Sequence, residues 1–155
     1  MTRTRTFDDL TRGQRRKVGR GDHGEVAEEL ASEAYGLAHA AHEKFWYDVR
    51  AYEHDDRATK GEVKSCHRTI GDSYPEAGRF RVRRDQHRSL TVSNAHATAW
   101  YIFVLFDEDE NRITLQRRRP PTVTRLVEER GGWNHAGHAE FEYQHKLPID
   151  TVIDV

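Results

Sequence analysis

The tripeptide Glu62-Val63-Lys64 places a carboxylate and an ammonium two positions apart in the chain. On an extended strand, successive side chains point to opposite faces, so Glu62 and Lys64 share one face while Val63 turns toward a core. A carboxylate oxygen is a ligand that Mg²⁺ prefers, and a neighbouring lysine can meet negative charge on a phosphate. The triplet is the first candidate for chemistry, although such a pair is also common on a solvated strand face.

A second acid can join this pair if two segments form a hairpin. The aromatic and β-branched segment 45–52 and the segment 61–66 are both typical of strands, and the polar residues between them indicate a turn. A turn centred near Asp55 sets Asp48 opposite Glu62, and directly opposed residues project from the same face of a sheet. Two hard oxygen ligands beside a lysine predict a magnesium site that acts on a phosphodiester.

A helix is expected to begin near Asp22, with Glu25 three residues later in the position of a capping box. Apolar residues recur at helical spacing after it: Val26, Leu30, Ala34, Leu37 and Ala41. Glu25 is either a third metal-site residue or simply a helix cap, and Glu28 and Glu29 are its substitutes one turn on.

Further segments are expected to supply the remaining strands and helices. In Gly78–Arg83, apolar residues alternate with three arginines that are expected to hold phosphates: Arg79, Arg81 and Arg83. A short helix is predicted over Asp85–Ser93. The apolar run Trp100–Phe106 is typical of a strand buried on both faces, and Arg112–Arg117 is its expected antiparallel neighbour. A helix over Val123–Arg130 and a strand over Ala139–His145 are expected to follow.

The composition is that of one polar α/β domain. The 155 residues carry a net charge of −1, with 35% hydrophobic and 33% charged residues. Residues 1–20 are basic and lack hydrophobic periodicity, so a flexible basic arm is expected there and a single domain over 21–155. The single cysteine, Cys66, favours a reducing compartment, and no apolar run approaches a membrane span. A cytoplasmic protein with no membrane partner is expected.

The order of these elements over residues 20–106 resembles the core of the PD-(D/E)xK nuclease superfamily, the restriction-endonuclease-like fold. The start of the first helix, Gly21-Asp22-His23-Gly24-Glu25, is similar to a glutamate-bearing motif of that family. Its metal-binding Asp falls on Asp48, its second acid on Glu62 and its lysine on Lys64. Tyr47 stands where the family's namesake Pro would be, a position that the family holds loosely.

The resemblance extends to the region after the third strand, where Gln86 and His87 fall on a polar motif of some members. It implies an α/β fold with a central mixed β-sheet flanked by helices, in αβββαβ order. It also implies a Mg²⁺-dependent endodeoxyribonuclease, with Mn²⁺ as a substitute. Asp48, Glu62 and the carbonyl of Val63 would hold the metal, and Lys64 would orient water or neutralise charge. Gln86 and His87 would contact DNA, although a surface helix carries such residues routinely.

Two other functions remain open at this point: a nucleic-acid-binding module that keeps the fold without cleaving, and a protein-interaction domain with an acidic hairpin. A homodimer is expected because double-strand cutting needs two sites, with aromatic residues near the C-terminus as its interface: Trp133, Phe141 and Tyr143. The histidines at 135, 138 and 145 offer imidazole ligands for zinc, but they lack a compact ligand motif and are also consistent with exposed polar residues.

Overall fold

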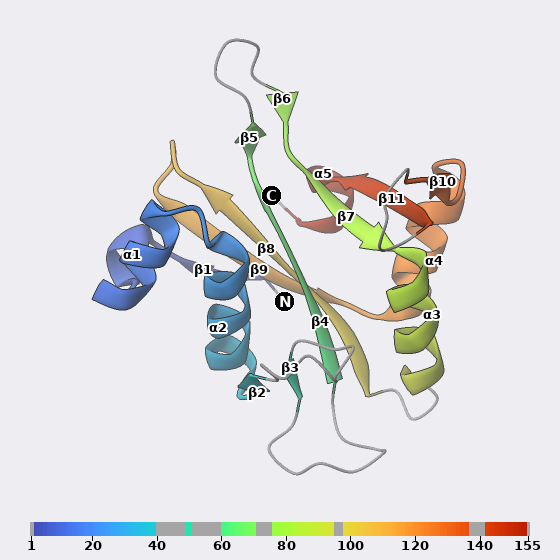
Figure 1. Ribbon diagram of the computed structural model, residues 1–155, viewed down its shortest axis with the longest axis horizontal. Coiled ribbons are helices and arrows are strands. Elements are labelled where there is room, and N and C mark those ends of the chain that lie inside the picture. Colours follow the sequence, from blue (N-terminus) through green and yellow to red (C-terminus); the bar gives the residue numbers. More distant parts are fainter. Residues whose placement is uncertain are drawn as a thin grey trace.

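A computed structural model of the chain describes residues 2–39, 49–50, 60–70, 76–94, 98–136 and 142–154. The main sheet has six strands in the following spatial order: β1 (Arg3–Arg5), β9 (Arg112–Arg118), β8 (Ala99–Asp107), β4 (Lys60–His67), β3 (Val49–Arg50) and β2 (Ala38–His39). One face of this sheet packs against α2 (His23–Tyr35). The other packs against α3 (Arg84–Ser93) and α4 (Pro120–Glu129), so the molecule has helices on both sides (Figure 1).

The described residues also form two smaller sheets. One has the order β10 (Asn134–His135), β11 (Tyr143–Pro148) and β7 (Arg79–Arg83), and the other pairs β5 (Thr69–Ile70) with β6 (Glu76–Ala77). The remaining elements are the 3₁₀ helix η1 (Phe7–Asp9) and the short helices α1 (Arg12–Gly19) and α5 (Ile149–Val152). No described helix has the length and apolar character needed to cross a membrane.

The central strand β8 separates two hydrophobic cores because it is apolar on both faces. Ile102, Val104 and Phe106 pack in the core beneath α2, while Tyr101 and Phe103 pack in the core beneath α3 and α4. Residues that alternate along a strand lie on opposite faces, so one apolar run supplies both cores. This is the arrangement predicted from the run Trp100–Phe106.

Strand β4 joins the hairpin to this central strand. Its pairing with β3 is antiparallel and matches Val49 with Gly61 and Arg50 with Lys60, which is the register expected for a turn near Asp55. Its pairing with β8 is parallel, and the connection between them contains β7 and α3. The elements α2, β3, β4, β7, α3 and β8 therefore follow one another in the predicted αβββαβ order, which confirms a mixed sheet flanked by helices.

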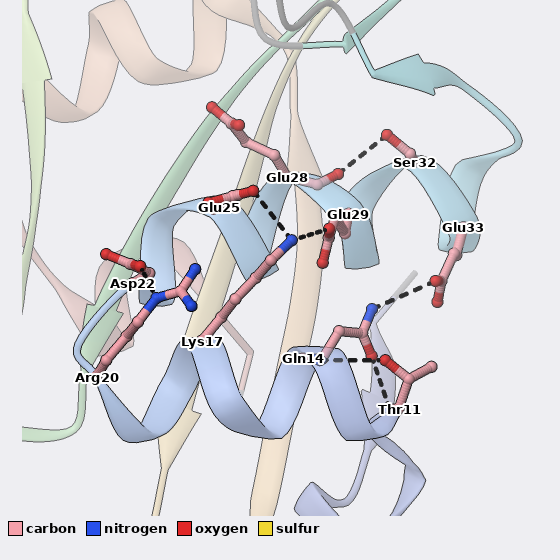
Figure 2. Close-up of polar contacts among 10 residues, drawn as sticks. All are labelled: Thr11, Gln14, Lys17, Arg20, Asp22, Glu25, Glu28, Glu29, Ser32 and Glu33. Carbon is pink, nitrogen blue, oxygen red and sulfur yellow. Dashed lines mark hydrogen bonds and ion pairs between the residues drawn. The ribbon is translucent and has the colours of Figure 1, made fainter.

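The first 20 residues differ from the flexible arm expected over 1–20. Strand β1 pairs antiparallel with β9, and Leu10 is buried in the core beneath α2. Helix α1 is capped reciprocally, because the Thr11 hydroxyl accepts from the Gln14 backbone while the Gln14 side chain accepts from the Thr11 backbone (Figure 2). These local bonds stabilise a segment that shows little hydrophobic periodicity.

A close backbone contact fixes the path from β4 to β7. The Gly78 N–H donates to the Arg68 carbonyl at 2.9 Å, just after β4 ends. A Cβ at position 78 would overlap the carbonyl oxygen of His67, so only glycine fits here. The start of β7 is thereby held against the end of β4.

Candidate active site

Glu62 and Lys64 lie on the face of β4 that is directed toward α3. Val63 belongs to the core beneath α2, so its two neighbours in the triplet face the other way. The Glu62 residue is only 3% exposed, and its Oε1 lies 3.1 Å from the Lys64 Nζ. The structure therefore places a carboxylate and an ammonium in contact, but in a buried position that the sequence did not indicate.

Gln86 on α3 completes this group. The Lys64 Nζ donates to the Gln86 Oε1 at 2.7 Å, so two of the three ammonium donors are held by described side chains. We expected Gln86 to contact DNA. The structure shows its amide in contact with the lysine, where it can orient Lys64, and the contact with DNA stays a prediction.

His87, the other predicted DNA contact on α3, is buried and bonded at both ring nitrogens. Its Nδ1 lies 2.8 Å from the Tyr101 hydroxyl and its Nε2 lies 2.7 Å from the Thr124 hydroxyl. Burial lowers the pKa of His87 to about 4, so the ring is neutral near pH 7. Thr124 itself donates to the Pro120 carbonyl, which leaves its oxygen to accept from His87.

This buried chain of hydrogen bonds anchors α3. Tyr101 lies on β8 and Thr124 on α4, so His87 ties α3 to both elements, and Gln86 is its neighbour in sequence. Tyr101 is also the strand partner of Glu62, and burial followed by the negative charge of Glu62 raises the pKa of Tyr101. His87 thus supports the position of Gln86 from within the fold, and its contact with DNA stays a prediction.

Glu25 lies away from this group. Its carboxylate is 2.9 Å from the Lys17 Nζ of α1, which also reaches Glu29 at 2.6 Å, and Figure 2 shows the lysine directed between these two acids of α2. Helix α2 packs on the Val63 face of the sheet, opposite the face of Glu62. The expected capping box is also missing, because the Asp22 side chain binds Arg20 instead.

A basic hollow of about 420 Å³ adjoins Lys64 and is lined in part by Arg79, Arg81 and Lys146. Arg81 and Lys146 are direct partners in the β7–β11 pairing, so they share a face. Arg83 differs from the other two predicted arginines because both Asp85 oxygens bind its guanidinium. Lys146 is a residue that the sequence reasoning missed, although its alternation with the buried His145 and Leu147 was a usable signal.

The structure also describes the contacts of the cysteine, of two aromatic residues proposed for a dimer interface, and of two histidines considered as zinc ligands. Burial raises the pKa of the Cys66 thiol to about 12, so it is a poor nucleophile. The Tyr143 ring is covered by the Arg84 guanidinium at 3.6 Å, and Trp133 packs on the core beneath α3 and α4. His145 is bonded to the Gly132 carbonyl, and His135 lies against Tyr143.

Three of the candidate residues lie outside the part of the chain that the structure describes: Asp48, His138 and Phe141.

Residues 13–154 match the PD-(D/E)XK nuclease superfamily domain. This match covers most of the chain, and we conclude that the protein belongs to the PD-(D/E)XK nuclease superfamily. The family uses divalent metals, and the Glu62 carboxylate fits such an ion because it is a hard oxygen donor beside a cation that can meet phosphate charge. A comparison with curated proteins gives no match for this chain.

Proposed function

We propose that this protein is a Mg²⁺-dependent endodeoxyribonuclease that hydrolyses DNA phosphodiester bonds. The observation that carries the proposal is the buried contact of Glu62 with Lys64, held by Gln86 and opening beside a basic hollow. Burying an ion pair has a desolvation cost, so an arrangement of this kind next to basic side chains favours a catalytic role over a merely soluble strand face.

The proposed metal ligands are Glu62, Asp48 and the carbonyl of Val63. The register of the two described pairs between β3 and β4, if continued by one residue, sets Asp48 opposite Glu62 and supports this choice. A bound Mg²⁺, or Mn²⁺ as its substitute, would polarise the phosphoryl oxygen and lower the pKa of a bound water. Glu25 is left out of the proposed site because Lys17 holds it on the other face of the sheet.

Lys64 has the central role among the side chains. Glu62 and Gln86 hold its ammonium. Its third donor would then serve the attacking water or a phosphoryl oxygen. A compact ammonium suits a single point of contact better than a planar guanidinium does.

DNA would be held by the basic hollow. Arg79, Arg81 and Lys146 are exposed and adjoin Lys64, so their charges can neutralise phosphates on either side of the scissile bond. Arg83, whose charge Asp85 meets, would contribute less. Cutting of both strands would require a homodimer, and the single cysteine fits a cytoplasmic location.

The test is a cleavage assay on plasmid, single-stranded and four-way-junction DNA with Mg²⁺, Mn²⁺, Ca²⁺ or EDTA. We expect cleavage with Mg²⁺ or Mn²⁺, binding with little turnover in Ca²⁺, and no cleavage in EDTA. Glu62→Gln is expected to remove activity, whereas Glu128→Gln makes the same charge change on the exposed side of α4 and is expected to retain it. Metal-independent cleavage, or full activity of Glu62→Gln, would overturn the proposal, and binding without cleavage would favour the non-cleaving module.

A further inference from the structure

A second group of metal-binding side chains lies at the other end of β4. His23, His67 and Glu108 each offer one ligand atom, and these three atoms lie within 4.8 Å of one another. We propose that they form a transition-metal site that prefers Zn²⁺ and is separate from the magnesium site at Glu62.

The three ligand atoms lie close to one another. The Glu108 Oε1 lies 2.7 Å from the His67 Nδ1 and 3.8 Å from the His23 Nε2. In a tetrahedral zinc site with bonds near 2.0–2.1 Å, neighbouring ligand atoms are roughly 3.4 Å apart. Small side-chain rotations therefore suffice to bring all three atoms to bonding distance.

The two histidines lie at the ends of regular elements, and the glutamate lies in a turn. His23 begins α2, His67 ends β4, and Glu108 follows β8 in its turn to β9. The His23 ring packs edge-on against Phe106 at 5.0 Å, and a hydrogen bond with the Gly21 backbone orients it further. Such outer contacts fix the ring of a ligating histidine and leave its other nitrogen for the metal.

The kinds of donor indicate zinc and not magnesium. Two imidazoles and one carboxylate suit Zn²⁺, whereas Mg²⁺ is usually bound by oxygen ligands alone. Three protein ligands leave a fourth position for water.

The site cannot share an ion with Glu62. Five positions separate Glu62 from His67, which at about 3.3 Å per residue on a strand is about 16 Å. The odd spacing also puts the two side chains on opposite faces of the sheet. An ion bound at His67 would instead connect α2, β4 and the turn after β8, and so stabilise the folded chain.

The test is thermal unfolding of the EDTA-treated full chain with added Zn²⁺ or Mg²⁺. We expect Zn²⁺ at a hundredfold excess over its Kd to raise Tm by roughly 5–10 °C. Mg²⁺ is expected to give no such rise in Tm. His67→Ala and Glu108→Gln are expected to lose the shift. His135→Ala removes an exposed histidine from β10 and is expected to keep it.

Co²⁺ provides a direct probe of the ligands. A site with two imidazoles is expected to give visible Co²⁺ absorption that is lost in Glu108→Gln, a substitution that keeps side-chain size at an exposed turn and so avoids a folding defect. The proposal would be overturned if Zn²⁺ did not raise the Tm of the unmodified chain. It would also be overturned if Zn²⁺ raised the Tm of His67→Ala and Glu108→Gln as much as that of the unmodified chain. These readouts need no DNA cleavage, so they stand or fail separately from the proposed nuclease activity.

Discussion

The two ends of β4 carry different chemistry on opposite faces. At the first end, buried Glu62 contacts Lys64, and the adjoining hollow is basic. At the second end, His67 contacts the half-exposed Glu108 and lies beside the ring of His23. The first set suits a hard cation and a phosphate, and the second suits a softer cation with no phosphate.

The difference shows that the neighbouring elements decide the use of each strand residue. Lys64 acquires its setting from α3, which presents Gln86, while His67 acquires its setting from α2, which presents His23. Since alternation sends one set to each face, a single strand can support both sites without competition between them. Substitutions on one face should therefore leave the other site unchanged.

The sharpest way to separate the two ends is Lys64→Met. We expect cleavage to fall by about 10²–10³-fold, because a positioned cation is lost where charge develops on the phosphate. The Zn²⁺-induced rise in Tm should be unaffected. Single-turnover cleavage assays and thermal unfolding measure the two effects. If Lys64→Met cleaves DNA at the normal rate, Lys64 has no part in the proposed mechanism.

Low pH should reduce the stability of the folded protein because His87, which supports the Lys64 face of the sheet, is buried in its neutral form. The unfolded chain binds a proton on this residue near pH 6.5, while the folded protein does so only near pH 4. Stability from the neutral ring is therefore full above pH 6.5 and declines as the pH falls toward 4, by about 3 kcal/mol in total. That is roughly a hundredfold change in the folding equilibrium.

His87→Gln tests this effect, since an amide keeps hydrogen-bonding groups but does not titrate in this range. Urea unfolding at several pH values is expected to show a shallower decline between pH 6.5 and 4 in the variant than in the original chain. Parallel pH profiles in the two proteins would contradict a buried neutral His87.

Gln86→Leu should have a smaller effect, on turnover alone. Loss of the amide leaves Lys64 bound by Glu62 but less firmly oriented, so we expect about a tenfold lower kcat with little change in KM. Arg88→Ala changes an exposed residue of the same helix and serves as the control. An equal loss in KM would instead indicate that Gln86 contacts DNA.

The smallest expected effects come from the basic hollow. Arg81→Gln and Lys146→Gln should each weaken DNA binding similarly for all sequences and lower the slope of log affinity against log salt by about one unit. Arg125→Gln, on the exposed side of α4, should change the slope little. Binding titrations at several salt concentrations decide this, and unchanged slopes in both hollow variants would move the DNA surface elsewhere.

Local patterns were enough to predict the elements around the candidate site. The triplet Glu62-Val63-Lys64 and the alternation in Gly78–Arg83 have a period of two, so the shared faces follow from strand geometry alone. The register between β3 and β4 follows from a hairpin of known centre. The position of Asp48 itself stays a prediction.

Tertiary packing decided what the sequence could not show. His87 was predicted to lie on the surface. In the structure it is buried, and its hydrogen-bond partners are hydroxyl groups from β8 and α4. Glu25 was a candidate for either the metal site or a helix cap, but α1 folds back and supplies Lys17 as its partner. The position of α1 was not predicted because the first 20 residues are held by the pairing of β1 with β9 and by the cap of α1. Neither interaction requires hydrophobic periodicity in the sequence.

The alternation along β4 also limits how this chain can vary in length. Inserting or deleting one residue between Glu62 and His67 would turn one of the two to the wrong face, so a single such event would destroy one site even if every ligand were retained. Relatives that keep both sites are therefore expected to preserve an odd spacing in this strand. Single-residue insertions and deletions should instead be found in the surface loops of these relatives, where a change in length does not move a site residue to the opposite face of the sheet.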